Sequence, residues 1–390
     1  MENRFLQIHY LSSYPGTLLN RDEAGFAKRI VFGGVSRTRI SSQCLKRHWR
    51  THEGEYSLKD IGIPMSTRSR QIFEKFIVEP LLLEFSPEKV RLITEALMSA
   101  VLGKSEKKSE KPKKNEDERN SQNELECKAV VVLGKVEIDY LLNLTRTLCN
   151  TLDNPKKSKD VENAIPKELK NNLKALGKAA AGLDGVLFGR MVTSDLLARV
   201  DAAIHVAHAF TVHGEASEND YFSVVDDLVQ LGSGHINNTE LTTGLYYGYV
   251  VIDIPLLFSN LEGYSFDVVA KVIENLIHLI ARVSPGAKLG STAPYAYAHL
   301  LMAEMGNGQP CTFANAFLKP VKDQPDLLNN TYNALTRHIK ELDAMYATQN
   351  RRGVACMGEM AQVDALANLQ EFQGIKELTT WVVDSLRGHE

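Results

Sequence analysis

The spacing of hydrophobic residues changes twice along the chain, and this constrains the fold more than any other feature. Residues 5–11 alternate loosely and are rich in aromatic and branched side chains, which is typical of a β-strand. Residues 66–101, 129–152 and 166–181 instead place apolar side chains at helical spacing. Period-two patterns return at 203–212 and 244–254. The sequence therefore predicts a sheet interrupted by a long helical insertion.

The remaining patterns define the fold class. We expect a helix at 265–283, a strand at 296–303, and further helices at 331–346 and 375–386. The order of strand, helical insertion, two strands, helix and strand indicates an α+β fold. It suits an open antiparallel sheet of RRM (RNA-recognition-motif) or ferredoxin-like type with large insertions.

Two segments are predicted to lie outside the core. The stretch between the strands 203–212 and 244–254 is polar and glycine-rich, so we expect it to project from the sheet. Residues 103–126 consist mainly of Lys, Glu, Ser and Asn with almost no apolar side chain. Such a segment cannot offset the entropy of ordering, and we expect a disordered surface insertion there.

Composition excludes several classes of protein. The 390 residues are 44% hydrophobic, enough for a sizeable core, yet no apolar run has the length of a signal peptide or a membrane span. The five cysteines are far apart, which argues against a disulfide framework and against a CxxC metal site. We therefore expect a cytoplasmic protein with no membrane segment, no bound metal and no cofactor.

Charge is distributed unevenly along the chain. Residues 1–50 contain nine Lys and Arg against three Asp and Glu, a net charge of +6, so the other 340 residues carry −9 of the total of −3. A segregated basic region offers a local binding surface for phosphates, while the acidic remainder discourages indiscriminate adhesion to nucleic acid.

The basic residues stand in a pattern suited to a phosphate backbone. Glycines in the turn-rich segment 12–40 let main chain approach an anion, and Ser41 can begin a helix whose first N–H groups are free to bind one. One face of that helix is polar and cationic, with Leu45 and Trp49 opposite. A solvated basic surface is the competing interpretation. The candidate ligands are Arg21, Lys28, Arg37, Arg39, Ser41, Gln43, Lys46, Arg47 and Arg50.

An ordered set of motifs resembles a known family. At the start of the chain these are Leu6-Gln-Ile-His9, Leu19-Asn-Arg-Asp22, Phe32-Gly-Gly34, Arg39-Ile-Ser-Ser-Gln43 and Leu45-Lys-Arg47. Further along come Gly189-Arg-Met191, Thr193-Ser194, Ile204-His-Val-Ala-His208, Tyr221-Phe222, Val225-Asp-Asp-Leu228, Pro285-Gly-Ala-Lys288 and Ala314-Asn-Ala-Phe317. Together they resemble the CasC-type backbone subunit of type I-E CRISPR Cascade over most of the chain.

The resemblance implies a hand-shaped protein for CRISPR-guided antiviral defence. It implies an RRM-like palm at 1–55 and 188–390, helical fingers at 56–187, and a thumb at 212–245. Its partners would be crRNA, target DNA, other copies of the chain stacked head to tail, and other Cascade subunits in one ribonucleoprotein complex. Such a subunit is not an enzyme: it holds the guide while base pairing reads the target.

The resemblance also assigns residues. Among the ligands already named it points to Arg21, Lys28, Arg37, Ser41, Gln43, Lys46 and Arg50, and it adds Met191, Thr193, Ser194 and Lys288 to the RNA-binding set. Bases would be displaced at regular intervals by Tyr221, Phe222 and Ser223 of the thumb, because stacking tolerates any sequence. Without the resemblance, Met191 would be read as a core residue. Val35 and Ser36 stand where related proteins often carry basic residues, which would shift the grip to Arg29, Arg37 or Arg39.

Catalytic and metal-binding interpretations compete with these assignments. A metal-dependent, RNA-cleaving backbone subunit would use Asp22, but a carboxylate directly after Arg21 is more often an ion pair that orders its loop. His205 and His208 would face opposite sides of a strand, so packing is favoured over metal binding for them and for His213. The adjacent Asp226 and Asp227 would diverge on any regular element and cannot share a metal.

Overall fold

The structure is a computed structural model. It describes residues 3–103, 125–153, 155, 158–166, 169–190, 197, 199–225, 233–358, 360, 366 and 368–387. Contacts divide the chain into two compact units. Unit 1 comprises residues 1–61, 204–255 and 265–390, and unit 2 comprises residues 62–203 and 256–264. The expected boundaries lay at 55/56 and 187/188, close to the first division and earlier than the second.

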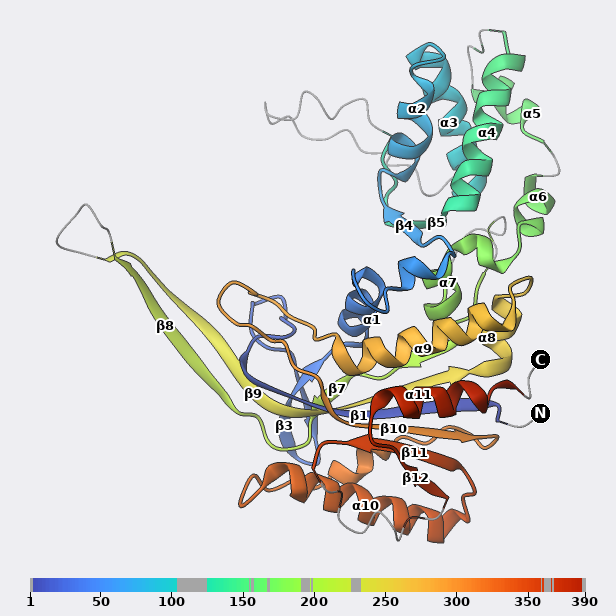
Figure 1. Ribbon diagram of the computed structural model, residues 1–390. Helices are drawn as coiled ribbons and strands as arrows, with labels where there is room; N and C mark the ends of the chain where they lie inside the picture. The colour runs from blue at the N-terminus through green and yellow to red at the C-terminus, as the bar shows by residue number, and fades with distance from the viewer. Residues whose placement is uncertain are drawn as a thin grey trace. The chain divides into compact units, whose positions relative to one another are not determined.

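The strands of the large sheet all belong to unit 1 (Figure 1). They are β1 (Phe5–Thr17), β2 (Arg29–Phe32), β3 (Val35–Ile40), β6 (Ile204–Val206), β7 (Ala209–Thr211), β8 (Ser217–Val225), β9 (Ser233–Asp253), β10 (Ala298–Gly306), β11 (Arg351–Cys356) and β12 (Leu369–Glu371). The helical segments of unit 1 are α1 (Ser42–Thr51), η1 (Leu58–Ile61), α9 (Phe266–Arg282), η6 (Phe313–Phe317), α10 (Leu327–Tyr346) and α11 (Ile375–Asp384), while α8 (Ile254–Asn260) crosses between the units.

The sheet has the order β12-β11-β10-β1-β9-β7-β3-β2, with β6 and β8 also paired to β9. The expected antiparallel pairing is found from β11 through β10, β1 and β9 to β2. The outermost pair differs, because β12 runs parallel to β11, so the sheet is mixed. The α+β class is confirmed in this coarser form.

Strand β1 is central, and both of its faces are covered. Its residues are buried almost without interruption, as expected for a strand between two helical layers. Leu11 belongs to the apolar core that includes Phe313 of η6 and Leu335 of α10. On the other face lies α9, which packs against β1 and β10, and α11 packs against α9. Figure 1 shows α10 on one side of the sheet and α9 with α11 on the other.

Strand β9 is long enough to serve two purposes. Between Thr242 and Asp253 it pairs with β1, deep in the sheet. Between Ser233 and Thr242 it pairs with β8. The hairpin of β8 and β9 is therefore a direct extension of a central strand, and Figure 1 shows it reaching beyond the sheet. This agrees with the expected projection between 212 and 245, although residues 226–232 lie outside the described part.

Unit 2 is mainly helical, as predicted from the spacing of its apolar residues. Its elements are β4 (Ser66–Ser69), η2 (Glu74–Val78), α2 (Glu79–Leu81), α3 (Pro87–Leu102), β5 (Val131–Gly134), α4 (Lys135–Thr151), α5 (Ser158–Ala164), α6 (Leu169–Ala175), η5 (Lys178–Ala181) and α7 (Leu183–Phe188). A core of side chains such as Phe73, Leu97 and Leu141 joins η2, α3 and α4. Nearly all of the charged segment 103–126 lies outside the described residues. None of the helices in the described ranges combines the length and hydropathy that crossing a membrane requires.

Candidate nucleic-acid interface

Helix α1 forms the centre of the candidate site, and its beginning is set by local sequence. Ser41 has extended backbone geometry and its hydroxyl accepts the N–H of Cys44 at 3.2 Å, as an N-cap should. Leu45 and Trp49 are buried on one side of the helix. On the other side Gln43 and Arg47 are exposed, while Lys46 and Arg50 are half-buried. The predicted division into an apolar and a cationic face is confirmed.

The loop before β2 folds back onto the start of α1. The side-chain oxygen of Asn20 accepts the N–H of Ser41 at 2.9 Å, and its backbone oxygen accepts the N–H of Lys28 at the same distance. The backbone oxygen of Lys28 in turn accepts the N–H of Arg39 at 2.8 Å. These bonds connect the segments of Lys28 and Arg39 to the start of the helix, although Lys28 is well separated from it in sequence.

His208 joins this group from a distant part of the chain. Its Nδ1 lies 3.3 Å from the N–H of Ser42 and 3.2 Å from Nη1 of Arg39. Burial lowers the pKa of His208, and the charges of Arg39, Lys28 and Lys46 lower it further. The ring is therefore neutral at pH 7 and can accept a hydrogen bond through Nδ1. Sequence reasoning assigned His208 to packing, because it could not show that Arg39 contacts the ring and that the charges of Lys28 and Lys46 act on it.

The pKa of the Cys44 thiol, in the first turn of α1, is also affected by nearby cations. Burial raises the pKa of its thiol to about 11, against the opposing influence of Lys28 and Arg47. We call Lys28, Arg39, Lys46 and Arg47, whose charges act on His208 or on Cys44, the α1 basic cluster. Arg39 is further held by the backbone oxygen of Arg29, at 3.1 Å from its Nε.

Two other arginines of the expected track have different roles. Arg37 is fully buried, and its guanidinium donates to the backbone oxygens of Thr211 and Phe317 at 3.0 Å each. The assignment of Arg37 to phosphate binding is therefore corrected: the side chain joins β3 to β7 and η6. Arg29 contacts two carboxylates, those of Glu215 and Glu240, so its charge is already compensated.

The turn between β2 and β3 depends on glycine. Gly33 has a φ of +63°, and a Cβ at this position would lie 1.7 Å from the backbone oxygen of Leu318. No side chain fits there without displacing main chain. Gly33 of the motif Phe32-Gly-Gly34 thus serves a close approach of backbone to backbone, where sequence reasoning had expected an approach to phosphate.

The other predicted site residues are placed as follows. Arg21 is exposed in the loop before β2, where its backbone forms an isolated antiparallel β-bridge with Ala27. Lys288 lies in the loop after α9, is exposed, and donates to the hydroxyl of Thr239 in β9. Tyr221 in β8 is 66% exposed. Phe222 and Ser223 pair through their backbones with Asn237 and Ile236, but their side chains are outside the described part, as are Met191, Thr193, Ser194, Asp226 and Asp227.

The residues considered for catalysis and metal binding have structural contacts. The carboxylate of Asp22 accepts the N–H of Phe26 at 2.9 Å, which closes the loop it belongs to. The Nδ1 of His213 lies 2.7 Å from the backbone oxygen of Gly214, and its Nε2 accepts the N–H of Leu245 at 3.1 Å. Within the described ranges, no three His, Cys, Asp or Glu side chains are grouped closely enough to hold a metal.

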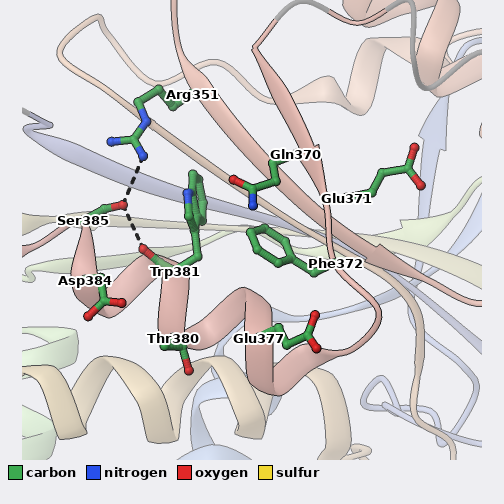
Figure 2. Close-up of a pocket in the computed structure, with 9 residues that line it drawn as sticks. All are labelled: Arg351, Gln370, Glu371, Phe372, Glu377, Thr380, Trp381, Asp384 and Ser385. Carbon is green, nitrogen blue, oxygen red and sulfur yellow. Dashed lines mark hydrogen bonds between the residues drawn. The ribbon is translucent and has the colours of Figure 1, made fainter.

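A separate pocket of about 700 Å³ lies between β12 and α11 (Figure 2). The guanidinium of Arg351 lies 5.4 Å from the ring centre of Trp381. Three carboxylates also line the pocket, those of Glu371, Glu377 and Asp384. With three acids against one guanidinium the pocket disfavours phosphate, so it does not extend the α1 basic cluster.

Comparisons with known proteins cover nearly the whole chain. A family model described as CT1975-like protein matches residues 6–381. One solved chain, from a structure described as "CRISPR RNA-guided surveillance complex, pre-nicking", has a TM-score of 0.79 at 23% identity, covering 98% of this chain and 99% of that one. Another, from a "CRISPR RNA-guided surveillance complex", has a TM-score of 0.68 at 19% identity with the same coverage. At these identities the likeness shows the fold. No curated protein matches the sequence.

Proposed function

The chain belongs to the family of CT1975-like proteins, and from this premise we propose that it is a backbone subunit of a CRISPR RNA-guided surveillance complex. It holds the phosphate backbone of crRNA and supports pairing of the guide with target DNA. Several copies stack head to tail along the guide, next to other subunits of a type I-E Cascade. The similarity in fold to chains of solved surveillance complexes supports this proposal.

The α1 basic cluster is the observation that carries the proposal. Arg39 lies 3.2 Å from the imidazole of His208 at the start of α1, and the charges of Lys28 and Lys46 also lower the pKa of that ring. Grouping like charges is unfavourable for an isolated protein, and a bound polyanion relieves that repulsion. The positive end of the α1 dipole adds to the attraction for phosphate. We therefore revise the binding set by removing Arg37 and adding His208: it comprises Arg21, Lys28, Arg39, Ser41, Gln43, Lys46, Arg47, Arg50, His208 and Lys288. Met191, Thr193 and Ser194, which lie outside the described residues, remain predicted ligands.

The β8–β9 hairpin provides the second part of the proposed mechanism. The hairpin of one copy reaches the guide held by the next and displaces a base at each interval. The exposed ring of Tyr221 suits this role, because an aromatic face stacks on any base. Displacing bases at fixed intervals leaves the segments between them free for pairing with the target, which is how guide-directed recognition obtains its specificity.

The proposal is tested by purifying the chain from cells that transcribe a guide array and digesting the co-purified RNA with nuclease. We expect protected fragments whose lengths increase by a constant step, because each bound copy shields the same number of nucleotides. A matched preparation of the Lys28→Ala/Lys46→Ala variant should contain much less RNA. Absence of RNA from the wild-type protein, or fragments without a regular step, would contradict the proposal.

We assign no catalytic role to the chain, and Asp22 provides the test of that assignment. Its carboxylate already binds the backbone of Phe26, and this bond orders the loop. The assembled complex, with wild-type protein or Asp22→Ala, is incubated with matched RNA and magnesium. We expect equal amounts of intact RNA in both reactions. Cleavage by the wild type that the variant lacks would instead identify an RNA-cleaving subunit.

A further inference from the structure

Two glutamates stand at the base of the β8–β9 hairpin, one on each leg. Glu215 lies just before β8, and Glu240 lies in β9 opposite Asn219. The side chain of Glu240 is 5% exposed and that of Glu215 is 18% exposed. Burying a carboxylate costs free energy unless it is paired, so each of the two glutamates should have a cationic or hydrogen-bonding partner. Two acids beside a proposed RNA surface also work against phosphate binding.

Both carboxylates bind the same guanidinium. Arg29 of β2 donates through Nε to Glu215 at 2.6 Å and through Nη2 to Glu240. Glu240 also accepts the backbone N–H of Ala27 at 2.6 Å, and Glu215 accepts the hydroxyl of Ser36 at 2.7 Å. The hydrogen bond from Arg29 is the largest cause of the lowered pKa of Glu215. We call these five residues the hairpin clamp.

The clamp connects the hairpin to the segment that carries the α1 basic cluster. Ala27 directly precedes Lys28, and the backbone oxygen of Arg29 accepts the Nε–H of Arg39. A further backbone bond joins the N–H of Glu215 to the oxygen of Ser36 at 2.9 Å. Through Arg29, the base of the hairpin and the cationic surface thus share one set of hydrogen bonds.

Such a connection has a mechanical consequence. Between Ser233 and Thr239 the described strands give β9 no partner other than β8, and a two-stranded ribbon alone is marginally stable in water. The direction of the ribbon therefore depends on what holds its base. A guanidinium that bridges two carboxylates from different legs restrains both legs at once, because its planar fork fixes their geometry.

We propose that the hairpin clamp sets the direction of the β8–β9 hairpin relative to the α1 basic cluster before any RNA is bound. This inference rests on the proposed function, in which the hairpin reaches the guide held by a neighbouring copy. Glu215 and Glu240 are then positioning residues: they contact no nucleotide, and they determine where along the guide the hairpin meets a base. Regular spacing along the RNA follows from a preset direction.

Glu240→Gln is the primary test, and Glu218→Gln is its matched control. Both substitutions remove one negative charge from the same hairpin, but Glu218 is exposed on β8 and is not part of the clamp. The amide that replaces the carboxylate in Glu240→Gln can still accept the N–H of Ala27, but it lacks the charge that holds Arg29. Arg29→Lys serves as a second variant, since a lysine keeps the charge without the fork.

The first measurement is amide hydrogen exchange of the purified chain without RNA. We expect exchange at Ala27 and Glu215 to become about tenfold faster or more in Glu240→Gln, as for loss of a charge-assisted hydrogen bond, and to stay unchanged in Glu218→Gln. Far-ultraviolet circular dichroism verifies that each variant is folded. If Glu240→Gln exchanges as slowly as the wild type at both amides, the clamp does not hold the hairpin and the inference fails.

The second measurement is the nuclease protection pattern of each complex. If the glutamates act only by repelling phosphate, both glutamine variants should bind RNA more tightly and keep the constant step between protected fragments. The clamp predicts that Glu240→Gln and Arg29→Lys lose the constant step between fragments, while Glu218→Gln keeps it. An intact step in Glu240→Gln overturns the inference. If the wild type itself shows no step, the proposed function fails, and the exchange measurement still decides whether the clamp exists.

Discussion

Replacing Lys28 and Lys46 together by alanine tests the α1 basic cluster most directly. Both charges lower the pKa of His208, so both lie near its ring, although the two lysines are 18 positions apart in sequence. Each contact with a single-stranded phosphate contributes about −0.7 to the slope of log K against log salt. Losing two contacts should therefore flatten the slope by about 1.4 and weaken binding on the order of tenfold at about 0.15 M salt.

The assay is a titration of labelled single-stranded RNA at several salt concentrations, with uridine-rich, adenine-rich and mixed sequences. Between about 50 and 200 mM salt, the wild-type protein should lose about sevenfold more affinity than the variant. The loss should be the same for every sequence, because phosphates carry no sequence information. The double variant Lys376→Ala/Arg387→Ala removes two exposed charges at α11 and should change neither value. An unchanged slope, or a loss confined to one sequence, would refute the reasoning.

Three further variants address the scaffold. Arg37→Met should lower the free energy of unfolding by about 3 kcal/mol in urea titrations, because the carbonyls of buried neighbours lose their donor; a loss of RNA affinity at unchanged stability would contradict this. His9, whose pKa is lowered to about 3 by burial and by Arg352, stays neutral in the folded chain, whereas the unfolded chain takes up a proton below pH 6.5. The free energy of unfolding should thus fall by up to about 1.4 kcal/mol for each unit by which the pH is lowered from about 6 to 4. His9→Phe should remove this pH dependence from acid unfolding curves. Glu137→Gln removes the carboxylate that pairs with the buried guanidinium of Arg190 and should lower the free energy of unfolding by about 3–5 kcal/mol, measured as faster amide exchange in unit 2; equal exchange would show that the pair contributes little.

Elements with a strong local signal were predicted well. The helix beginning after Ser41 and the helices near 265–283 and 375–386 occur close to their expected bounds, and the strand expected at 5–11 begins at Phe5 but continues to Thr17, into the segment expected to be a loop. Each has its own periodicity or cap, which short-range physics is sufficient to specify. The pattern at 203–212 was interpreted as one strand, whereas the structure has β6 and β7, both paired with β9 and interrupted next to His208.

Short strands at the sheet edges were not predicted. Strands β2, β3, β11 and β12 contain three to six residues and carry arginine, glycine or glutamate where a core strand would alternate. Their pairing is determined by neighbours that are distant in sequence, such as β10 for β11 and β7 for β3. Local patterns carry little information on such pairing, because strand preference depends on what lies alongside.

The basic segment at residues 1–50 separates what the sequence predicts from what the tertiary structure determines. Composition and order alone determined that cations are concentrated in residues 1–50, that Ser41 begins a helix, and that this helix has one cationic face. Only the tertiary structure determined the burial and the partners of each cation. Arg37 is buried against η6, Arg29 is bound by two glutamates, and Arg39 lies beside His208. A side chain's charge is a local property, whereas its burial and its partners depend on distant segments: Glu215 is 186 positions from Arg29, and His208 is 169 positions from Arg39.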